Sequence, residues 1–309
     1  MYKYLISFIV AVFIAALIIG QCRGDDYDSV NEDDLEYVEQ TSESTSTETI
    51  IKGQRNLGAD INIEDKSDVV IVPEPSMVTY ISDDLEIPKL TKDLAEQIVS
   101  RIGYTASYNI STKNPNWVSW HLTREHTTGL VPRYKGYLDD HDVKGYTPSE
   151  MDWYNMPQSL SHGHMCPAGD NKWDEKAMEQ TFLLSNMCPQ TKSLNSGSWN
   201  KLEEKCRDWS KKYGSIYIVC GPVFFSETPK TMGNAKIWIP DAFFKVILCM
   251  EGTPKAIGFV YANDEEPHNM QQSAMAVDEI EAITGIDFFY SLPDDIEDSI
   301  EAVVDFKNW

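Results

Sequence analysis

The residues best suited to chemistry gather between Ser161 and Arg207. Two histidines flank a glycine in the segment SHGH, at His162 and His164. Two histidines on one face of a strand can bind a metal, and one of them can equally be a hydrogen-bonded core residue. The segment by itself therefore predicts either a metal ligand or a structural histidine.

A second group follows at intervals of four residues along an expected helix. Its members are Asn195, Trp199, Glu203 and Arg207, and this spacing places them along one side of a helix. An amide oxygen and a carboxylate are hard ligands, suited to a Mg²⁺ ion that keeps several waters. An ordinary amphipathic helix with solvated Asn and Glu side chains is the alternative interpretation.

The order and content of these segments resemble the DNA/RNA non-specific endonucleases, the endonuclease G-like family of ββα-metal nucleases. The matching segments are SHGHMCPAGDNKW, FLLSNMCPQTKSLNSGSWNKLEEKCRDW and YIVCGPVF. Outside them, NPNWVSWHLT, IPDAFFKVIL and AVDEIEAITGIDFFYSLPD also match, as does the spacing of Arg133, Tyr137 and Asp140. The resemblance covers residues 86–309. It implies an α+β fold in which helices flank a central antiparallel sheet.

The resemblance also implies a role for individual residues. His164 corresponds to the general base that activates water, and Arg133 to an arginine that stabilises transition-state charge. Asn195 corresponds to the protein ligand of Mg²⁺, with Mn²⁺ as an alternative ion, and Glu203 to the carboxylate that orients metal-bound water. The implied reaction is sequence-independent hydrolysis of DNA and RNA that leaves 5′-phosphates, and homodimers occur in the family. The expected substrate-binding residues are Arg207, Asn186, Gln190 and His162, although a structural role for Asn186 and Gln190 is equally open.

The sequence departs from the family pattern at two positions. The family motif DRGH is SHGH here, so Ser161 replaces an aspartate and His162 replaces an arginine. Because an imidazole is a weaker, pH-dependent donor, we expect an active nuclease with reduced or pH-shifted efficiency. Two alternatives remain at this point. One is a catalytically impaired envelope protein that binds nucleic acid, and the other is a zinc-binding envelope protein that uses His162 and His164 together.

Net charge is distributed unevenly along the chain. The 309 residues include 49 acidic and 26 basic side chains, a net charge of −23, which argues against phosphate binding if taken as a whole. Residues 23–100 carry 20 acidic against 6 basic side chains, and residues 263–309 carry 13 against one. Residues 101–262 carry a net +2, so the region of the expected site is compatible with phosphate. The lysines that could line a groove there are Lys172, Lys176, Lys192, Lys201, Lys205, Lys211 and Lys212.

The first 22 residues predict export. Lys3 precedes an apolar stretch from Leu5 to Gly20, which fits a signal peptide better than a membrane-spanning helix. Cys22 follows this stretch and is a candidate for lipidation, although Gln21 occupies a position where lipoprotein signals usually have a small residue. An uncleaved anchor is the alternative. Residues 23–85 predict an acidic, disordered linker, and the nuclease domain is expected at 86–309.

Periodicity predicts a mixed set of elements after the linker. Helices are expected at Thr91–Arg101, at Ser198–Tyr213 and at 270–284, the last two ending at a glycine. The segments NPNWVSWHLT, SIYIVCGPVFF and FFKVILCM are rich in β-branched and aromatic residues and predict strands. Strands and helices without regular alternation predict an α+β domain. Five cysteines remain after Cys22, and they are either buried thiols or members of one or two disulfides.

Overall fold

The computed structural model describes residues 84–145 and 147–309 of the chain. The expected export segment (1–22), with Cys22, and nearly all of the expected acidic linker (23–85) lie outside the described residues. Among the described residues, no helix is both long enough and apolar enough to cross a membrane.

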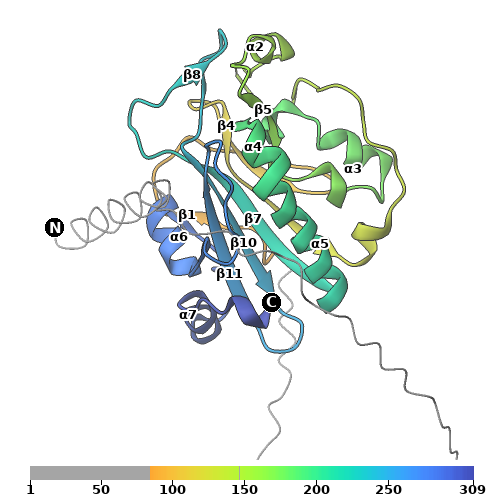
Figure 1. Ribbon diagram of the computed structural model, residues 1–309, viewed down its shortest axis with the longest axis vertical. Helices are drawn as coiled ribbons and strands as arrows, with labels where there is room; N and C mark the ends of the chain where they lie inside the picture. Colours follow the sequence, from red (N-terminus) through yellow and green to blue (C-terminus); the bar gives the residue numbers. More distant parts are fainter. Residues whose placement is uncertain (1–83, 146) are drawn as a thin grey trace, which may run out of the picture. The chain divides into compact units, whose positions relative to one another are not determined.

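A seven-stranded antiparallel sheet forms the centre of the described chain (Figure 1). Its strands lie in the order β12-β11-β10-β7-β4-β3-β2. Each of the three segments expected to be strands supplies one long strand of this sheet, namely β4, β7 and β10, which confirms those predictions. The strands are β2 (Gln97–Ser100), β3 (Thr105–Asn109), β4 (Asn114–Thr123), β7 (Ser215–Val223), β10 (Ala242–Cys249), β11 (Lys255–Ala262) and β12 (Ala274–Met275).

Shorter elements surround this sheet. Three two-stranded pairs are β1 (Lys89–Leu90) with β13 (Ile286–Asp287), β5 (Leu160–His164) with β6 (Met187–Thr191), and β8 (Thr231–Met232) with β9 (Ile237–Trp238). The helices are α2 (Glu150–Tyr154), α3 (Glu175–Gln180), α4 (Lys192–Leu194), α5 (Asn200–Tyr213), α6 (Val277–Thr284) and α7 (Asp294–Glu301). Single 3-10 turns occupy Glu125–Thr128, Ala168–Asp170, Leu184–Asn186 and Phe306–Asn308.

Alternate side chains of β10 contribute to separate cores on the two faces of the central sheet. Phe243 belongs to the core that includes Trp209 of α5, whereas Phe244 belongs to the core that includes Ile280 of α6 and Ile300 of α7. Successive side chains of a strand point to opposite faces of a sheet. Helix α5 therefore covers one face, and α6 and α7 cover the other (Figure 1). This arrangement confirms an α+β fold with a central antiparallel sheet flanked by helices.

The β5–β6 pair and α5 form a ββα unit that carries most of the expected site. In the pair, Gly163 lies opposite Cys188 and His164 opposite Met187. A Cβ atom on Gly163 would lie 2.5 Å from the side-chain oxygen of Gln190, so the close approach of the two strands requires glycine at that position. The chain then continues from β6 through α4 into a π-helical turn, Asn195–Trp199, and from there into α5.

One expected helix is absent, because Thr91–Arg101 contains the edge strand β2 instead. The three apolar residues at helical spacing are all exposed: Leu94 by 40%, Ile98 by 53% and Ile102 by 52%. Val99, between them, is the buried residue and pairs with Ala106 of β3. A spacing of four residues is an even number, so it fits one side of a strand as well as one side of a helix. The helical prediction for this segment was wrong.

The other two expected helices form with changed starting points. Helix α5 begins at Asn200 and ends at Tyr213, directly before Gly214, whose φ of 107° suits a residue without a side chain. In the segment 270–284, only Val277–Thr284 is helical, while Ala274–Met275 pairs with β11 as β12. The end of each helix was predicted correctly from its glycine, whereas the start was not.

The five cysteines in the described part of the chain are buried free thiols. They are Cys166, Cys188, Cys206, Cys220 and Cys249. Of the two possibilities raised by the sequence, the structure therefore has buried cysteines without a disulfide among them.

Candidate active site

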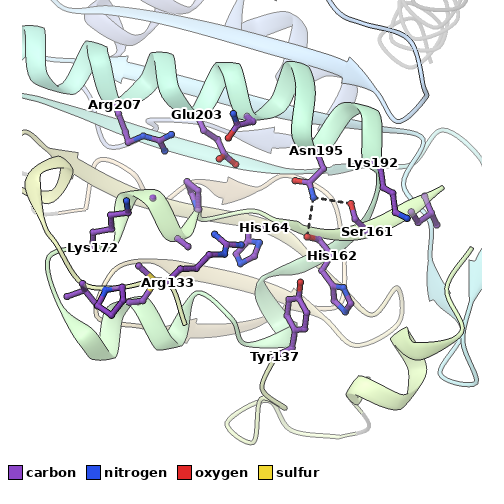
Figure 2. A pocket seen from close by; sticks show the side chains of 18 of the residues that line it. Arg133, Tyr137, Ser161, His162, His164, Lys172, Lys192, Asn195, Glu203 and Arg207 are labelled. Atoms are coloured by element: carbon purple, nitrogen blue, oxygen red, sulfur yellow. Dashed lines mark hydrogen bonds between the residues drawn. The ribbon is translucent and has the colours of Figure 1, made fainter. Parts of the chain in front are cut away.

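A polar pocket of about 800 Å³ opens beside β5 and α5. Six of the expected site residues line it: Arg133, His162, His164, Asn195, Glu203 and Arg207. Figure 2 shows Asn195, Glu203 and Arg207 along one side and Arg133 with His164 across from them. The four-residue spacing along the chain thus places its polar members on the pocket. Trp199, the fourth member of the series, is fully buried in the core beneath.

His164 ends β5 at the base of the pocket and is only 7% exposed. Its Nε2 is buried and has no hydrogen-bond partner, which leaves Nδ1 as the nitrogen that can reach the pocket. The ring stands edge-on to Phe182, with centroids 4.9 Å apart. Burial lowers the pKa of His164 to about 3, and the charges of Arg133 and His162 act in the same direction. The imidazole is therefore neutral at pH 7, the state that can accept a proton.

Arg133 lies across the same phenylalanine. Its guanidinium carbon is 4.9 Å from the centroid of the Phe182 ring, a distance suited to a cation–π contact. Among the residues that the structure describes, no carboxylate forms an ion pair with Arg133. Phe182 thus supports both the expected base and an exposed arginine whose charge is available to an anionic ligand.

Asn195 is held by its amide nitrogen. The Nδ2 atom donates to Ser161 Oγ at 3.0 Å and more weakly to the carbonyl oxygen of His162 at 3.4 Å. Both acceptors belong to β5, so the amide nitrogen faces that strand and the side-chain oxygen faces the side of the pocket where Glu203 lies (Figure 2). The π-helical turn that begins at Asn195 supplies this placement, and such turns often occur at functional sites.

Glu203 and Arg207 extend the site along α5. Burial raises the pKa of Glu203 to about 7, and the positive charge of Lys245 opposes this rise. Arg207 forms an ion pair with Asp170 at 2.8 Å, and the other oxygen of Asp170 accepts a hydrogen bond from Trp120 at 3.1 Å. Arg207 is therefore fixed at the pocket by a buried carboxylate.

Two further features of the site were not predicted from the sequence. Gly169 lies so close to Arg207 that a Cβ atom there would be 2.7 Å from the guanidinium. Lys245 is fully buried in β10, and its Nζ lies 4.4 Å from the Trp199 ring centroid and 5.0 Å from that of Trp120. Although burial disfavours the charged ammonium group, the neighbouring Cys220, Glu203 and Asp170 raise its pKa. The sequence could have drawn attention to Lys245, because it is the one charged residue within the apolar segment FFKVILC.

His162 does not have the surroundings of a donor that titrates near neutral pH. Its ring is stacked between Tyr137, with centroids 3.8 Å apart, and Trp153, with centroids 4.4 Å apart. Burial lowers its pKa to about 4, and its Nε2 has no hydrogen-bond partner. At pH 7 this imidazole is neutral. His162 therefore lines the pocket as a neutral ring stacked between two aromatic side chains, and its role in binding substrate stays a prediction.

Asn186 and Gln190 are placed behind the pocket rather than on it. Both are fully buried. Asn186 accepts from the backbone nitrogen of Cys166 at 2.9 Å and donates to the carbonyls of Cys166 and Thr181, also at 2.9 Å. Gln190 packs against Gly163. Of the two roles considered for this pair, the geometry favours the structural one over contact with substrate.

The donor atoms at the pocket suit a metal that keeps most of its waters. Asn195 offers an amide oxygen that accepts no hydrogen bond from the described residues, and Glu203 offers a carboxylate; together they match the few hard protein ligands that Mg²⁺ prefers. In the described part of the chain, a group of three close carboxylate, histidine or cysteine ligands occurs only at Asp278, Glu281 and Glu301. A zinc site at His162 and His164 would lack its further ligands, so the pocket does not support that alternative.

A histidine at the end of a β-strand pair, facing asparagine and glutamate from the next helix, defines the pocket as that of a ββα-metal nuclease. Residues 81–295 match the sequence profile of the DNA/RNA non-specific endonuclease family. The chain belongs to this family.

Individual relatives agree with this assignment. The mitochondrial nuclease EXOG of Xenopus laevis is 32% identical over 211 residues, which cover 63% of this chain and 58% of that protein. A nuclease of Nostoc is 28% identical over 229 residues, covering 70% of this chain and 81% of that protein. Human mitochondrial endonuclease G is 30% identical over 162 residues, covering 49% and 54%. The matches span less than two thirds of both mitochondrial relatives.

A solved structure shows the same fold. A chain in the crystal structure of an EndoG/EndoGI complex superposes with a TM-score of 0.60 at 24% identity, covering 64% of this chain and 87% of that one. The likeness confirms the antiparallel sheet and ββα arrangement.

Proposed function

We propose that this protein is a metal-dependent nuclease that hydrolyses phosphodiester bonds of DNA and RNA without sequence preference. The observation that carries the proposal is the placement of neutral His164 across one pocket from the tethered Asn195. A proton acceptor and a metal ligand are then available to the same phosphate. Membership of the endonuclease family supports the same activity.

The residues of the pocket divide the reaction between them. His164 removes a proton from the attacking water, for which a neutral imidazole is required. Arg133 and Arg207 place positive charge beside the phosphate as negative charge grows on its oxygens. Asn195 would hold Mg²⁺, with Mn²⁺ as a substitute, and the ion would offset charge on the phosphate and on the leaving oxygen. The carboxylate of Glu203 accepts hydrogen bonds from water on the same side of the pocket.

Sequence-independent binding follows from the groups at the rim. Lys172 and Lys192 line the pocket, and lysines contact phosphates without reading bases. Four of the other five expected lysines have partners away from the pocket: Lys176 pairs with Glu179, Lys211 pairs with Asp208, Lys205 lies over Trp209 and Lys212 lies over Tyr213. With two lysines at the pocket, we expect the protein to bind nucleic acid with modest affinity. The metal ion should then offset much of the charge of the bound phosphate.

The proposal is tested with the full chain, supercoiled plasmid and single-stranded RNA. Mg²⁺ should support nicking and linearisation of the plasmid and degradation of the RNA, EDTA should stop both, and the products should carry 5′-phosphates. Substitution Asn195→Ala should raise the Mg²⁺ concentration needed for half-maximal cleavage. Binding of plasmid without cleavage at any metal concentration would instead identify a catalytically impaired nucleic-acid-binding protein.

We also propose that the chain acts outside the cytoplasm. The apolar stretch Leu5–Gly20 after Lys3 supports export, and Cys22 supports attachment to the envelope through a lipid. Fractionation of cells that express the full chain tests this, with Cys22→Ala as the variant that should release the protein from membranes. An unchanged membrane fraction would favour an uncleaved anchor.

A further inference from the structure

Three carboxylates meet between α6 and α7, on the face of the sheet opposite α5. Asp278 and Glu281 lie three residues apart on α6, which places them on one side of that helix. Glu301 is the last residue of α7. One ligand atom from each residue lies within 4.8 Å of the other two. Nothing in the reaction at the pocket uses these groups.

Glu301 is buried without a partner. Its exposed fraction is 3%, and its Oε1 atom has no hydrogen bond. The preceding residue, Ile300, packs in the core of this face. A carboxylate removed from water without a compensating contact is strongly disfavoured. Glu301 therefore needs either a proton or a cation.

Among the described residues, the charges that act most strongly on Glu301 are all negative. Its charged neighbours are Glu281, Glu297, Asp278 and Asp287, which add to burial in raising the pKa of Glu301 to about 10. Among the described residues, no ion pair includes any of the three clustered carboxylates. Lys92 donates to the carbonyl oxygen of Ile283, near the C-terminal end of α6.

One member of the cluster is held in position by the backbone. Glu281 Oε1 accepts a hydrogen bond from the backbone nitrogen of Phe288 at 2.7 Å, which leaves its other oxygen available. Asp278 is exposed, so water can reach the cluster from that side. A fixed carboxylate, a buried carboxylate and an exposed carboxylate beside water form an irregular oxygen cage. Ca²⁺ accepts such cages, whereas Mg²⁺ demands near-octahedral geometry and usually takes one or two carboxylates.

We propose that Asp278, Glu281 and Glu301 bind Ca²⁺ at a structural site separate from the catalytic pocket. The ion would tie the end of α7 to α6 and so fasten the C-terminal segment to the sheet. Because binding to the folded state alone stabilises a protein, the site should show itself in thermal unfolding, independently of nuclease activity.

The test uses calorimetry on the full chain after removal of divalent ions. At a Ca²⁺ concentration about 100 times Kd, Tm should rise by about 5 °C, and the rise should persist in Asn195→Ala, which removes the expected ligand at the pocket. Glu301→Gln should abolish the rise. Asp295→Asn makes the same charge change at an exposed position of α7 and should retain it.

A second variant covers the case in which Glu301→Gln does not fold. Asp278→Asn alters an exposed ligand, and we expect it to weaken Ca²⁺ binding about tenfold in equilibrium dialysis. The proposal is overturned if wild-type Tm does not respond to Ca²⁺, if Glu301→Gln or Asp278→Asn responds as wild type does, or if Mg²⁺ raises the Tm of Asn195→Ala as much as Ca²⁺ does. A higher Tm for Glu301→Gln together with no response of wild type to Ca²⁺ would show that the buried carboxyl is simply protonated.

Discussion

Asn195 donates its side-chain amide to Ser161 Oγ at 3.0 Å. Ser161 in turn donates to the backbone carbonyl of Gln190 at 3.1 Å, so the hydroxyl links both strands of the β5–β6 pair to the expected metal ligand. Ser161 stands where the family motif has an aspartate. The departure therefore preserves an acceptor for Asn195 while removing a negative charge from the pocket.

Substitution Ser161→Ala should weaken metal binding. Without the hydroxyl, the Asn195 amide keeps only the longer contact to the His162 carbonyl, and its oxygen is less firmly oriented. Loss of such an outer contact typically lowers metal affinity or activity by about 10-fold or more. The measurement is the Mg²⁺ concentration for half-maximal cleavage. Ser226→Ala, in an exposed loop, is the control, and equal Mg²⁺ dependence of the two variants would contradict this role of Ser161.

Substitution His162→Phe should leave the pH dependence of cleavage unchanged above about pH 5. A phenyl ring can occupy the stack between Tyr137 and Trp153, and the pKa of His162, about 4, already makes the native ring neutral there. The imidazole binds a proton below pH 6.5 when unfolded but only near pH 4 when folded, so native stability falls as pH drops through that range. The variant should therefore resist acid unfolding better than wild type.

Two measurements check this prediction: the pH–rate profile from pH 5 to 9, and Tm at pH 5 compared with pH 7. If the wild-type rate changes with pH near neutrality and this change disappears in His162→Phe, then His162 titrates during catalysis and the prediction is wrong. A second variant, His162→Arg, restores the residue type of the family motif at this position. Because guanidinium groups stack on aromatic rings, we expect it to fold and to add a permanent charge beside the phosphate.

Substitution Lys245→Met should move the acid limb of the pH–rate profile upward. Lys245 opposes the rise in the pKa of Glu203, which burial sets at about 7. Without the lysine this pKa rises further, so a higher pH is needed to ionise Glu203, and we expect a displacement of about one pH unit. Tm is measured in parallel, because Lys245 also lies over the Trp199 and Trp120 rings and its loss affects their packing.

The matched control is Lys255→Met. Lys255 also lies over aromatic rings, those of Tyr213 and Trp309, and none of the residues that line the pocket contacts it. An unchanged profile in Lys245→Met would mean that the buried charge does not act on Glu203.

The double substitution Lys172→Ala, Lys192→Ala should weaken binding of duplexes of any sequence. Each phosphate contact releases counterions, so the slope of log affinity against log salt should become less steep by about 2. Fluorescence anisotropy at several salt concentrations, with Ca²⁺ or EDTA to limit cleavage, measures it. Lys176→Ala is the control, since that lysine pairs with Glu179 away from the pocket. A salt slope equal to that of wild type would exclude phosphate contacts by these two lysines.

Much of the site could be predicted because its residues carry chemistry in short, ordered segments. The spacing from Asn195 to Arg207 and the SHGH strand identified five residues that the structure brings to one pocket, and the family resemblance added Arg133. The residues that act on these six were not predicted, because they come from distant segments of the chain. Phe182 contacts the His164 ring, and the charge of Lys245 acts on the pKa of Glu203. Contacts of this kind depend on tertiary packing, which single-residue patterns do not specify.

The elements were predicted unevenly for a related reason. Strong local signals gave the strands β4, β7 and β10 and the ends of α5 and α6 at Gly214 and Gly285. The segment Thr91–Arg101 failed because pairing with β3 overrides its helical spacing. His162 shows the same limit at the site, since burial between Tyr137 and Trp153 lowers its pKa, and its neighbours in the sequence do not specify this packing.

The central claim is that His164 accepts the proton from the attacking water. The most direct measurement is the single-turnover rate of plasmid nicking by His164→Ala at saturating Mg²⁺, beside His141→Ala, an exposed histidine outside the pocket. Loss of general-base catalysis should lower the rate by about 10²–10⁴-fold, with DNA binding and Tm close to wild type, while His141→Ala cleaves normally. A rate for His164→Ala within a few-fold of wild type would contradict the account.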